Sequence, residues 1–168
     1  MSEEIFDVCD ADDNVIGQAT RSEVHATGLL HRAVHIWVWR TDGRLMIHLR
    51  SATKDQYPLC YTSAASGHVD TGEDYETAAH RELQEELGLG GRLVFQTKLS
   101  ASPATANEHT VLYFLNSDEE PTPDPNEIAK IEYRNPDELR QLIAREPEKL
   151  SPPFLSLLTE WYFASDVE

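Results

Sequence analysis

Residues 67–89 read GHVDTGEDYETAAHRELQEELGL, and this stretch contains the strongest structural signals in the chain. Residues 66–71 hold glycine and small or polar side chains, which predicts a loop. Residues 73–87 contain no proline or glycine, which predicts a helix. A stripe of side chains at every fourth position of this helix should pack on a sheet. The stripe consists of Tyr75, Ala79, Leu83 and Leu87.

An acidic face lies beside this stripe. Glu82, Glu85 and Glu86 stand at i, i+3 and i+4, so the predicted helix brings the three carboxylates together, where like charges repel and cost stability. A divalent cation relieves that repulsion, and hard oxygen ligands suit Mg²⁺ or Mn²⁺. A run of charges is usually only a solvated helix face. Here, however, the charges cluster on one flank and only Arg81 offers nearby compensation, so we predict a metal site.

The same stretch matches a known motif at every position. It fits G-x5-E-x7-R-E-U-x-E-E-x-G-U, where U is apolar, from Gly67 to Leu89. With seven positions fixed to one residue type and two restricted to apolar residues, a chance match occurs about once in 10⁹ to 10¹⁰ starting points. This is the Nudix box, and the chain therefore resembles the Nudix hydrolases, which cleave a diphosphate linked to another group with the help of a metal. The resemblance implies an α/β/α sandwich.

The other residues predict strands before and after the box helix and further helices near the end. Loops are expected at residues 51–66 and 117–126, and the alternation within residues 45–50 predicts a strand with one polar face. This order predicts an α+β fold with a mixed β-sheet between helices, in a single domain spanning residues 1–168. Strands are predicted at residues 5–8, 15–20, 32–40, 45–50, 92–99, 109–115 and 128–133, and helices within 21–30, from 135 or 136 to 145, and after a capping Ser151.

Charge and cysteine content narrow the classes of partner. With 14 basic and 30 acidic residues among 168, the net charge is −16, which should repel nucleic acids and anionic membranes. A free diphosphate is repelled as well, so a metal is expected to mediate its capture. Cys9 and Cys60 are too few for a disulfide framework and lack metal-ligand spacing. The acidic residues 1–13 predict no signal peptide, and we expect a cytoplasmic protein.

The resemblance extends beyond the box to the isopentenyl-diphosphate isomerase branch, especially its hydrolase-like bacterial relatives. The stretches that carry it are HATGLLHRAVHIWVW from residue 25, LRSATKDQYP from residue 49 and SPPF from residue 151. The isomerases have a catalytic cysteine where this chain has Ser66, a cation-stabilising tryptophan where it has Pro153, and an acid where it has Ala106. A serine hydroxyl is too weak an acid to replace a thiol in allylic proton transfer. These departures and the complete box favour hydrolysis.

The same resemblance implies a second metal site. Its ligands would be His25, His31 and His68, with help from Glu108. The first two histidines are six residues apart instead of the seven of the isomerases. The alternative is that the histidines satisfy hydrogen bonds of loops and that Glu108 is an exposed glutamate at the start of a strand.

The predicted mechanism uses the box carboxylates. Glu82, Glu85 and Glu86 are expected to hold one to three Mg²⁺ or Mn²⁺ ions, with the carbonyl of Gly67 as a further ligand. The metal lowers the pKa of a bound water, and a carboxylate takes its proton before the hydroxide attacks phosphorus. Glu85 and Glu108 are the two candidates for this base.

Supporting roles are expected for other charged residues. Arg81 should orient a neighbouring glutamate through a charge-assisted hydrogen bond, and Glu73 should stabilise the turn before the helix. Arg50 and Lys54 either contact the distal phosphate of the substrate or lie on the surface.

The predicted function is metal-dependent hydrolysis of a nucleoside diphosphate derivative or another small organic diphosphate. The alternatives are an isopentenyl-diphosphate isomerase and a catalytically weak module that senses nucleotides. Tyr57 and Trp37 either stack on a base of the substrate or belong to the core, and the sequence does not separate these alternatives. It also leaves the oligomeric state open, with a homodimer as one option.

Overall fold

The computed structural model describes residues 3–166, and its centre is a mixed sheet of seven strands. The main path runs β5-β4-β3-β8-β7, while β6 pairs with β3 and β9 pairs with β4. The central strand β3 is parallel to β8 and antiparallel to β4 and β6. The strands are β3 (His31–Trp39), β4 (Leu45–Arg50), β5 (Tyr61–Ser63), β6 (Ala65–His68), β7 (Val94–Leu99), β8 (Glu108–Asn116) and β9 (Ile128–Arg134).

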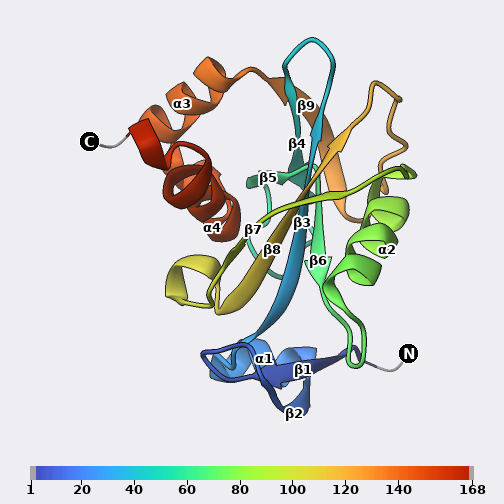
Figure 1. The fold of residues 1–168 in the computed structure, drawn as a ribbon, viewed down its shortest axis with the longest axis vertical. Helices are drawn as coiled ribbons and strands as arrows, with labels where there is room; N and C mark the ends of the chain where they lie inside the picture. The colour runs from blue at the N-terminus through green and yellow to red at the C-terminus, as the bar shows by residue number, and fades with distance from the viewer. Residues whose placement is uncertain (1–2, 167–168) are drawn as a thin grey trace.

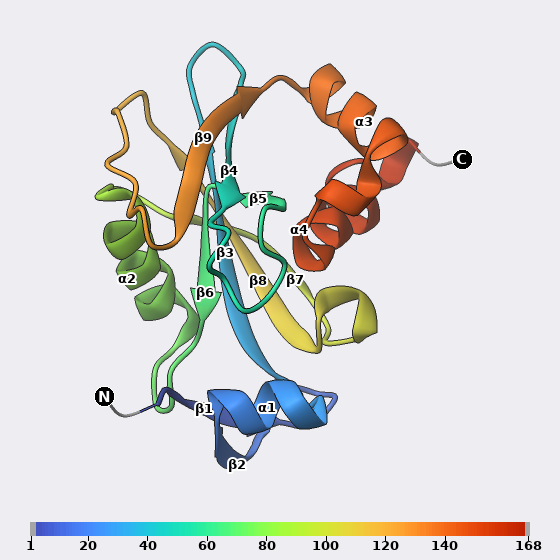
Figure 2. The same cartoon turned by 180° about the vertical axis from the view of Figure 1, so that it is seen from behind.

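Helices cover both faces of this sheet (Figures 1 and 2). Helix α2 (Tyr75–Leu87) packs on one face, and α3 (Pro136–Arg145) and α4 (Pro152–Ser156) pack on the other. Alternation along β3 separates the two cores, because Val34 and Ile36 contact the α2 side while Trp37 contacts the α4 side. The predicted α+β fold, with a mixed β-sheet between helices in an α/β/α sandwich, is confirmed. The remaining helical segments are short 3₁₀-helices at Pro103–Thr105, Pro147–Lys149 and Ala164–Asp166 and a π-helix at Leu157–Tyr162, which continues from α4.

A small N-terminal unit crosses the end of β3 and β6 (Figure 1). It consists of β1 (Ile5–Cys9), β2 (Val15–Thr20) and α1 (Arg21–Thr27), as the sequence predicts. Phe6 and Val24 are fully buried in its core. Helix α1 ends at Gly28, whose φ of 68° lies in the left-handed region that glycine adopts without strain.

The box helix is confirmed along most of its predicted length. It begins at Tyr75, because the side chain of Asp74 accepts a hydrogen bond from the backbone N–H of Thr77 and caps the first turn. Ala79, Leu83 and Leu87 are buried against the sheet and Tyr75 packs beside them, as the predicted stripe requires.

The predicted loop at residues 51–66 is wrong, because it contains β5 and the start of β6. Strand β6 extends to His68, so the loop predicted at residues 66–71 is also shortened. The residues of β6 are mostly small and do not alternate between apolar and polar. They form a strand only because Ala65 to His68 pair with β3. A strand of this kind depends on its partner more than on its own propensity.

Two further expectations need correction. Strand β4 has no polar face, because helices cover both sides of the sheet and His48 is buried as deeply as its apolar neighbours. Ser151 precedes α4 at the N-cap position, but its hydroxyl donates to Thr62 Oγ1 at 3.0 Å instead of capping the helix. Within residues 3–166, no helix combines the length and the apolar character needed to cross a bilayer.

Candidate metal and substrate site

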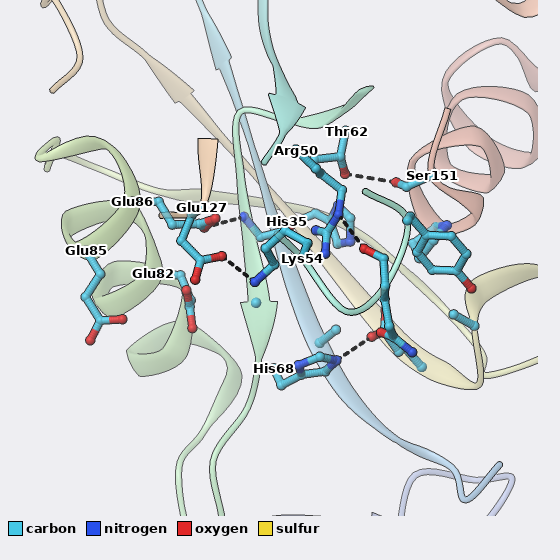
Figure 3. Close-up of a pocket in the computed structure, with 18 of the residues that line it drawn as sticks. His35, Arg50, Lys54, Thr62, His68, Glu82, Glu85, Glu86, Glu127 and Ser151 are labelled. Atoms are coloured by element: carbon cyan, nitrogen blue, oxygen red, sulfur yellow. Dashed lines mark hydrogen bonds and ion pairs between the residues drawn. The ribbon is translucent and has the colours of Figure 1, made fainter. Parts of the chain in front are cut away.

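A cavity opens where the central sheet forks. Strand β3 uses the same edge to pair with β6 at Ala33 to Ile36 and with β4 at Val38 and Trp39, so these two partners diverge. The cavity, about 170 Å³, lies in this fork between α2 and the segment that joins β4 to β5 (Figure 3). It is the place where residues far apart in the sequence meet.

Two box glutamates line the inner side of α2. Glu86 is only 4% exposed, and its Oε2 accepts a hydrogen bond from the backbone N–H of Ser66 at 2.9 Å. Burial raises the pKa of Glu86 well above its usual range, and the nearby charge of Glu82 raises it further. Burial likewise raises the pKa of Glu82 to about 7, although Arg81 opposes the shift. Ionising both carboxylates is costly because they are desolvated and close together. A bound cation would offset that cost, so the pair fits a cation site.

Gly67 is the wall against which Glu82 lies. A Cβ atom at residue 67 would stand 2.2 Å from Cδ of Glu82, which is far inside contact distance. Any other residue at position 67 would therefore force this carboxylate to move from its present place. No ion pair joins Glu86 to any residue between 3 and 166, so its negative charge lacks a protein counter-ion. The donor set of buried carboxylates fits Mg²⁺ or Mn²⁺.

The third glutamate stands apart from this pair. The side chain of Glu85 is 59% exposed, and its Oε2 lies 3.4 Å from Nη1 of Arg81. Glu85 therefore occupies the outer edge of the cavity (Figure 3). Among the described residues, the three box glutamates do not bring one ligand atom each within 4.8 Å of one another. The helix places all three on one flank, but only Glu82 and Glu86 turn inward.

Arg81 holds the start of the box to its helix. Its Nη1 donates to Glu82 at 2.7 Å, its Nε donates to Glu73 at 2.9 Å, and its Nη2 donates to the carbonyl of His68 at 3.1 Å. Glu73 also accepts a hydrogen bond from the backbone N–H of Asp70 at 3.1 Å. These contacts are the ones expected of an arginine that orients Glu82 and of a glutamate that closes the turn before α2.

The four residues of the suggested second site converge. One ligand atom each from His25, His31 and His68 lies within 4.8 Å of the others. Glu108 begins β8 directly opposite His31, and its Oε2 is 2.8 Å from Nε2 of His68 and 3.5 Å from Nε2 of His31. The left-handed turn at Gly28 reverses the chain between α1 and β3, so the six-residue spacing still brings the first two histidines together.

The protonation of this cluster suits a cation. Burial, then the neighbouring charges of His68 and Arg21, lowers the pKa of His25 to about 4, so its ring is neutral at pH 7. Burial alone would raise the pKa of Glu108, but the close contacts of its carboxylate with the His31 and His68 rings outweigh burial and hold that pKa below its usual range. Nε2 of His25 and Nε2 of His31 are buried and have no hydrogen-bond partner among residues 3–166. The alternative of an exposed Glu108 is wrong, because this residue is 7% exposed.

Cationic side chains line the wall that faces α2. Lys54 forms an ion pair with Glu127, and Nε of Arg50 donates to the carbonyl of Gln56 at 3.0 Å (Figure 3). Both residues border the cavity, so they are not merely surface charges. Tyr57 also lines it, with a positive φ of 51°.

Trp37, by contrast, is fully buried in the core and contacts Phe154 and Phe114. Stacking of Trp37 on a substrate is therefore excluded. The three positions at which the chain departs from the isomerases also meet in this cavity, since Ser66, Ala106 and Pro153 all line it.

Several lining residues were missed from the sequence, and Glu127 and His35 are two of them. Glu127 follows a proline-rich loop and looked like one of many scattered acids, and no sequence signal separates it from them. His35 belongs to the strand predicted at residues 32–40, and alternation places it on the same face as His31 and Trp37. That shared face was an available signal for His35.

Comparisons with known proteins agree with this geometry. A family model described as NUDIX domain matches residues 29–155. An isopentenyl-diphosphate Delta-isomerase of Serratia proteamaculans is 32% identical over 163 residues, which cover 94% of this chain and 91% of that protein. An uncharacterized Nudix hydrolase of Nostoc sp. is 36% identical over 151 residues, which cover 87% and 89% of the two chains.

Another uncharacterized Nudix hydrolase, from Streptomyces coelicolor, is 44% identical over 90 residues, and the match spans 54% of this chain and half of that relative's length. Among solved structures, the protein DR0079 of Deinococcus radiodurans has a TM-score of 0.82 and 28% identity, with 95% of this chain and 99% of that chain covered. These matches confirm the resemblance inferred from the box and from the stretches beyond it. The chain therefore belongs to the Nudix hydrolase superfamily, in the branch that also contains isopentenyl-diphosphate isomerases.

Proposed function

We propose that this protein hydrolyses a nucleoside diphosphate derivative or another small organic diphosphate with the help of Mg²⁺ or Mn²⁺. The observation that carries the proposal is the pair of the buried Glu86 and the largely buried Glu82, which lies across one cavity from Arg50 and Lys54. Carboxylates on one wall suit a divalent cation, and cations on the other suit phosphate oxygens. A diphosphate bridged to a metal satisfies both walls at once.

Each wall has a distinct task in this proposal. Glu82, Glu86 and the carbonyl of Gly67 would hold the metal, which supplies positive charge to the phosphate oxygens and acidifies water. Arg50 and Lys54 would bind the distal phosphate group of the substrate, the one that the water does not attack. Arg81 keeps Glu82 in place through the 2.7 Å hydrogen bond.

Glu85 is the better candidate for the general base. Its side chain is exposed and held only by a 3.4 Å contact with Arg81, so it is free to accept a proton from a water at the cavity edge. Oε2 of Glu108 is already engaged by His31 and His68. Glu108 is therefore better placed to support the histidine cluster than to act as the base.

The histidine cluster is the one feature that favours isomerisation as a second candidate function. By the resemblance, His25, His31, His68 and Glu108 match the metal ligands of the isomerases, and two buried ring nitrogens of this cluster lack hydrogen-bond partners in the described part of the chain. We include a second divalent cation at this cluster in the proposal. Isomerisation would still need an acid at residue 66, where a serine stands, and an aromatic shield at residue 153, where a proline stands. These positions favour hydrolysis over isomerisation.

One paired assay separates the candidates. The protein is incubated with a panel of nucleoside diphosphate derivatives and other organic diphosphates in Mg²⁺ or Mn²⁺. Phosphate release is measured directly for terminal diphosphates and, for capped ones, after a phosphatase has cleaved the phosphomonoester products. In parallel, isopentenyl diphosphate is tested for conversion to dimethylallyl diphosphate. We expect release from at least one compound, loss of release in Glu86→Gln, and normal release in the control Glu76→Gln, an exposed acid of the same helix. Dimethylallyl diphosphate at enzymatic rates would overturn the proposal, and binding without turnover would indicate a nucleotide sensor.

A further inference from the structure

His35 lines the cavity, yet the proposed mechanism gives it no task. It lies in the middle of β3, opposite Ser66 of β6 and Leu112 of β8, and is 3% exposed. Its ring forms part of the wall between the carboxylates of α2 and Arg50 (Figure 3). A buried imidazole in this place raises the question of which ring nitrogen carries its proton.

A chain of hydrogen bonds answers that question. Nδ1 of His35 is 2.6 Å from Oγ of Ser63, and Nε1 of Trp37 donates to the same oxygen at 2.9 Å. The indole N–H can only donate, so the hydroxyl of Ser63 accepts from Trp37. Ser63 is fully buried and has no other hydrogen-bond partner in the described part of the chain, which leaves Nδ1 as the only acceptor for its proton. Nδ1 is therefore unprotonated, because the alternative buries a hydroxyl hydrogen without an acceptor.

The ring is also neutral. Burial lowers the pKa of His35 to about 4; the charge of Glu108 opposes this shift, and the charges of Arg50 and His68 add to it. A neutral imidazole carries one N–H, and with Nδ1 unprotonated that group is Nε2–H. Nε2 makes no hydrogen bond to any residue from 3 to 166. Because Nδ1 turns toward Ser63, the ring edge left for the cavity carries this unused donor.

We propose that Nε2–H of His35 is a substrate-binding donor for an oxygen of the diphosphate, and that Ser63 and Trp37 are positioning residues that hold its tautomer. This inference rests on the proposed function. The acceptor is a phosphate oxygen because the neighbouring cavity residues Arg50 and Lys54 are cations suited to that group. A neutral donor adds a hydrogen bond without adding a charge that would repel the metal.

The tautomer can be read directly by NMR. Protein labelled with ¹⁵N in histidine is recorded with long-range ¹H–¹⁵N correlation, and the His35 signals are assigned by their absence from His35→Asn. We expect a protonated Nε2 and an unprotonated Nδ1, and a shift of the Nε2 signal when methylene diphosphonate, a non-hydrolysable diphosphate, is added with Mg²⁺. A protonated Nδ1, or an Nε2 signal that stays in place at saturating analogue, would overturn the inference.

Matched variants give an independent measurement of binding. The amide of His35→Asn can keep the contact with Ser63 but has no donor at the Nε2 position, and we expect the Kd for methylene diphosphonate to rise about 10- to 100-fold. Ser63→Ala should raise this Kd less, and its NMR spectrum should show both tautomers of His35. The control is His48→Asn, a buried histidine of β4 that binds the carbonyl of Ala64 and does not border the cavity, and it should bind the analogue as the wild type does.

The outcomes separate this inference from the proposed function. If the wild type neither binds nor hydrolyses any diphosphate, both fail together. If the wild type binds the analogue and hydrolyses diphosphates while folded His35→Asn binds it equally well, only the inference about His35 fails. Thermal melting of each variant shows that it is folded. If His35→Asn does not fold, the His35 signals are assigned by their change in Ser63→Ala, which keeps the tautomer test available.

Discussion

Replacing Glu82 by glutamine should stabilise the metal-free protein at neutral pH. Burial raises the pKa of Glu82 from its usual 4.5 to about 7 in the folded state, so the folded protein binds this proton more tightly than the unfolded chain does. The stability that this group contributes is therefore full below pH 4.5 and is lost as the pH rises to about 7. At about 1.4 kcal/mol per pKa unit, the loss amounts to about 3 kcal/mol.

The glutamine has the same shape but no charge to bury. Arg81 keeps its contacts with Glu73 and with the carbonyl of His68, so only one of its hydrogen bonds is weakened. Removing the charge also relieves Glu86, whose pKa the charge of Glu82 helps to raise. The expected gain at pH 7.5 is therefore about 2–3 kcal/mol without metal.

Urea unfolding in EDTA, followed from pH 4.5 to pH 8, measures this effect. We expect the wild type to lose stability across that range and Glu82→Gln to lose distinctly less. Adding millimolar Mg²⁺ should stabilise the wild type, because an ion that binds only the folded state shifts the equilibrium by mass action, and should stabilise the variant less. If the free energy of unfolding changes equally with pH in the two proteins and also rises equally with Mg²⁺, the placement of Glu82 in a buried cation site is refuted.

Further predictions follow from the same geometry. Glu86→Gln should lower turnover more than about 100-fold with the fold intact, and wild-type activity in that variant would remove Glu86 from the metal site. Gly67→Ala should displace the Glu82 carboxylate, which a Cβ would approach to 2.2 Å, and weaken Mg²⁺ binding in calorimetry; unchanged affinity would contradict this crowding. His25→Asn should lower the number of Mn²⁺ ions bound while Glu86→Gln leaves the histidine cluster loaded. Ser66→Cys alone should not produce isomerase activity, and detection of dimethylallyl diphosphate would show that one thiol suffices.

Local sequence determined the elements whose signals lie within a few residues. The box helix forms because its residues favour helix, Asp74 caps its first turn, and an apolar stripe every four residues finds a sheet to cover. Strand β3 follows from its branched and aromatic run. The branch of the superfamily was also readable, because the box and the stretches beyond it carry the resemblance that the comparisons confirm.

Tertiary structure alone decided which side chains share the cavity. Strand β6 exists because β3 offers it an edge, and this pairing sets Ser66 and His68 beside the glutamates and Glu108. Pairing and burial depend on residues far away in the chain, so no local pattern reports them. The same holds for protonation, since the shifts in Glu82 and Glu86 arise from desolvation that only the folded state imposes.

The amino-acid sequence by itself therefore supplied the groups on which the proposed chemistry depends: carboxylates for a cation, basic residues for phosphate, and a serine where an isomerase needs a thiol. Only the folded chain decided that Glu85 stays at the rim while Glu86 is buried, and that Trp37 belongs to the core and takes no part in substrate recognition. The physical reason is that residue type sets the available donors and charges, whereas direction and desolvation come from contacts between distant elements.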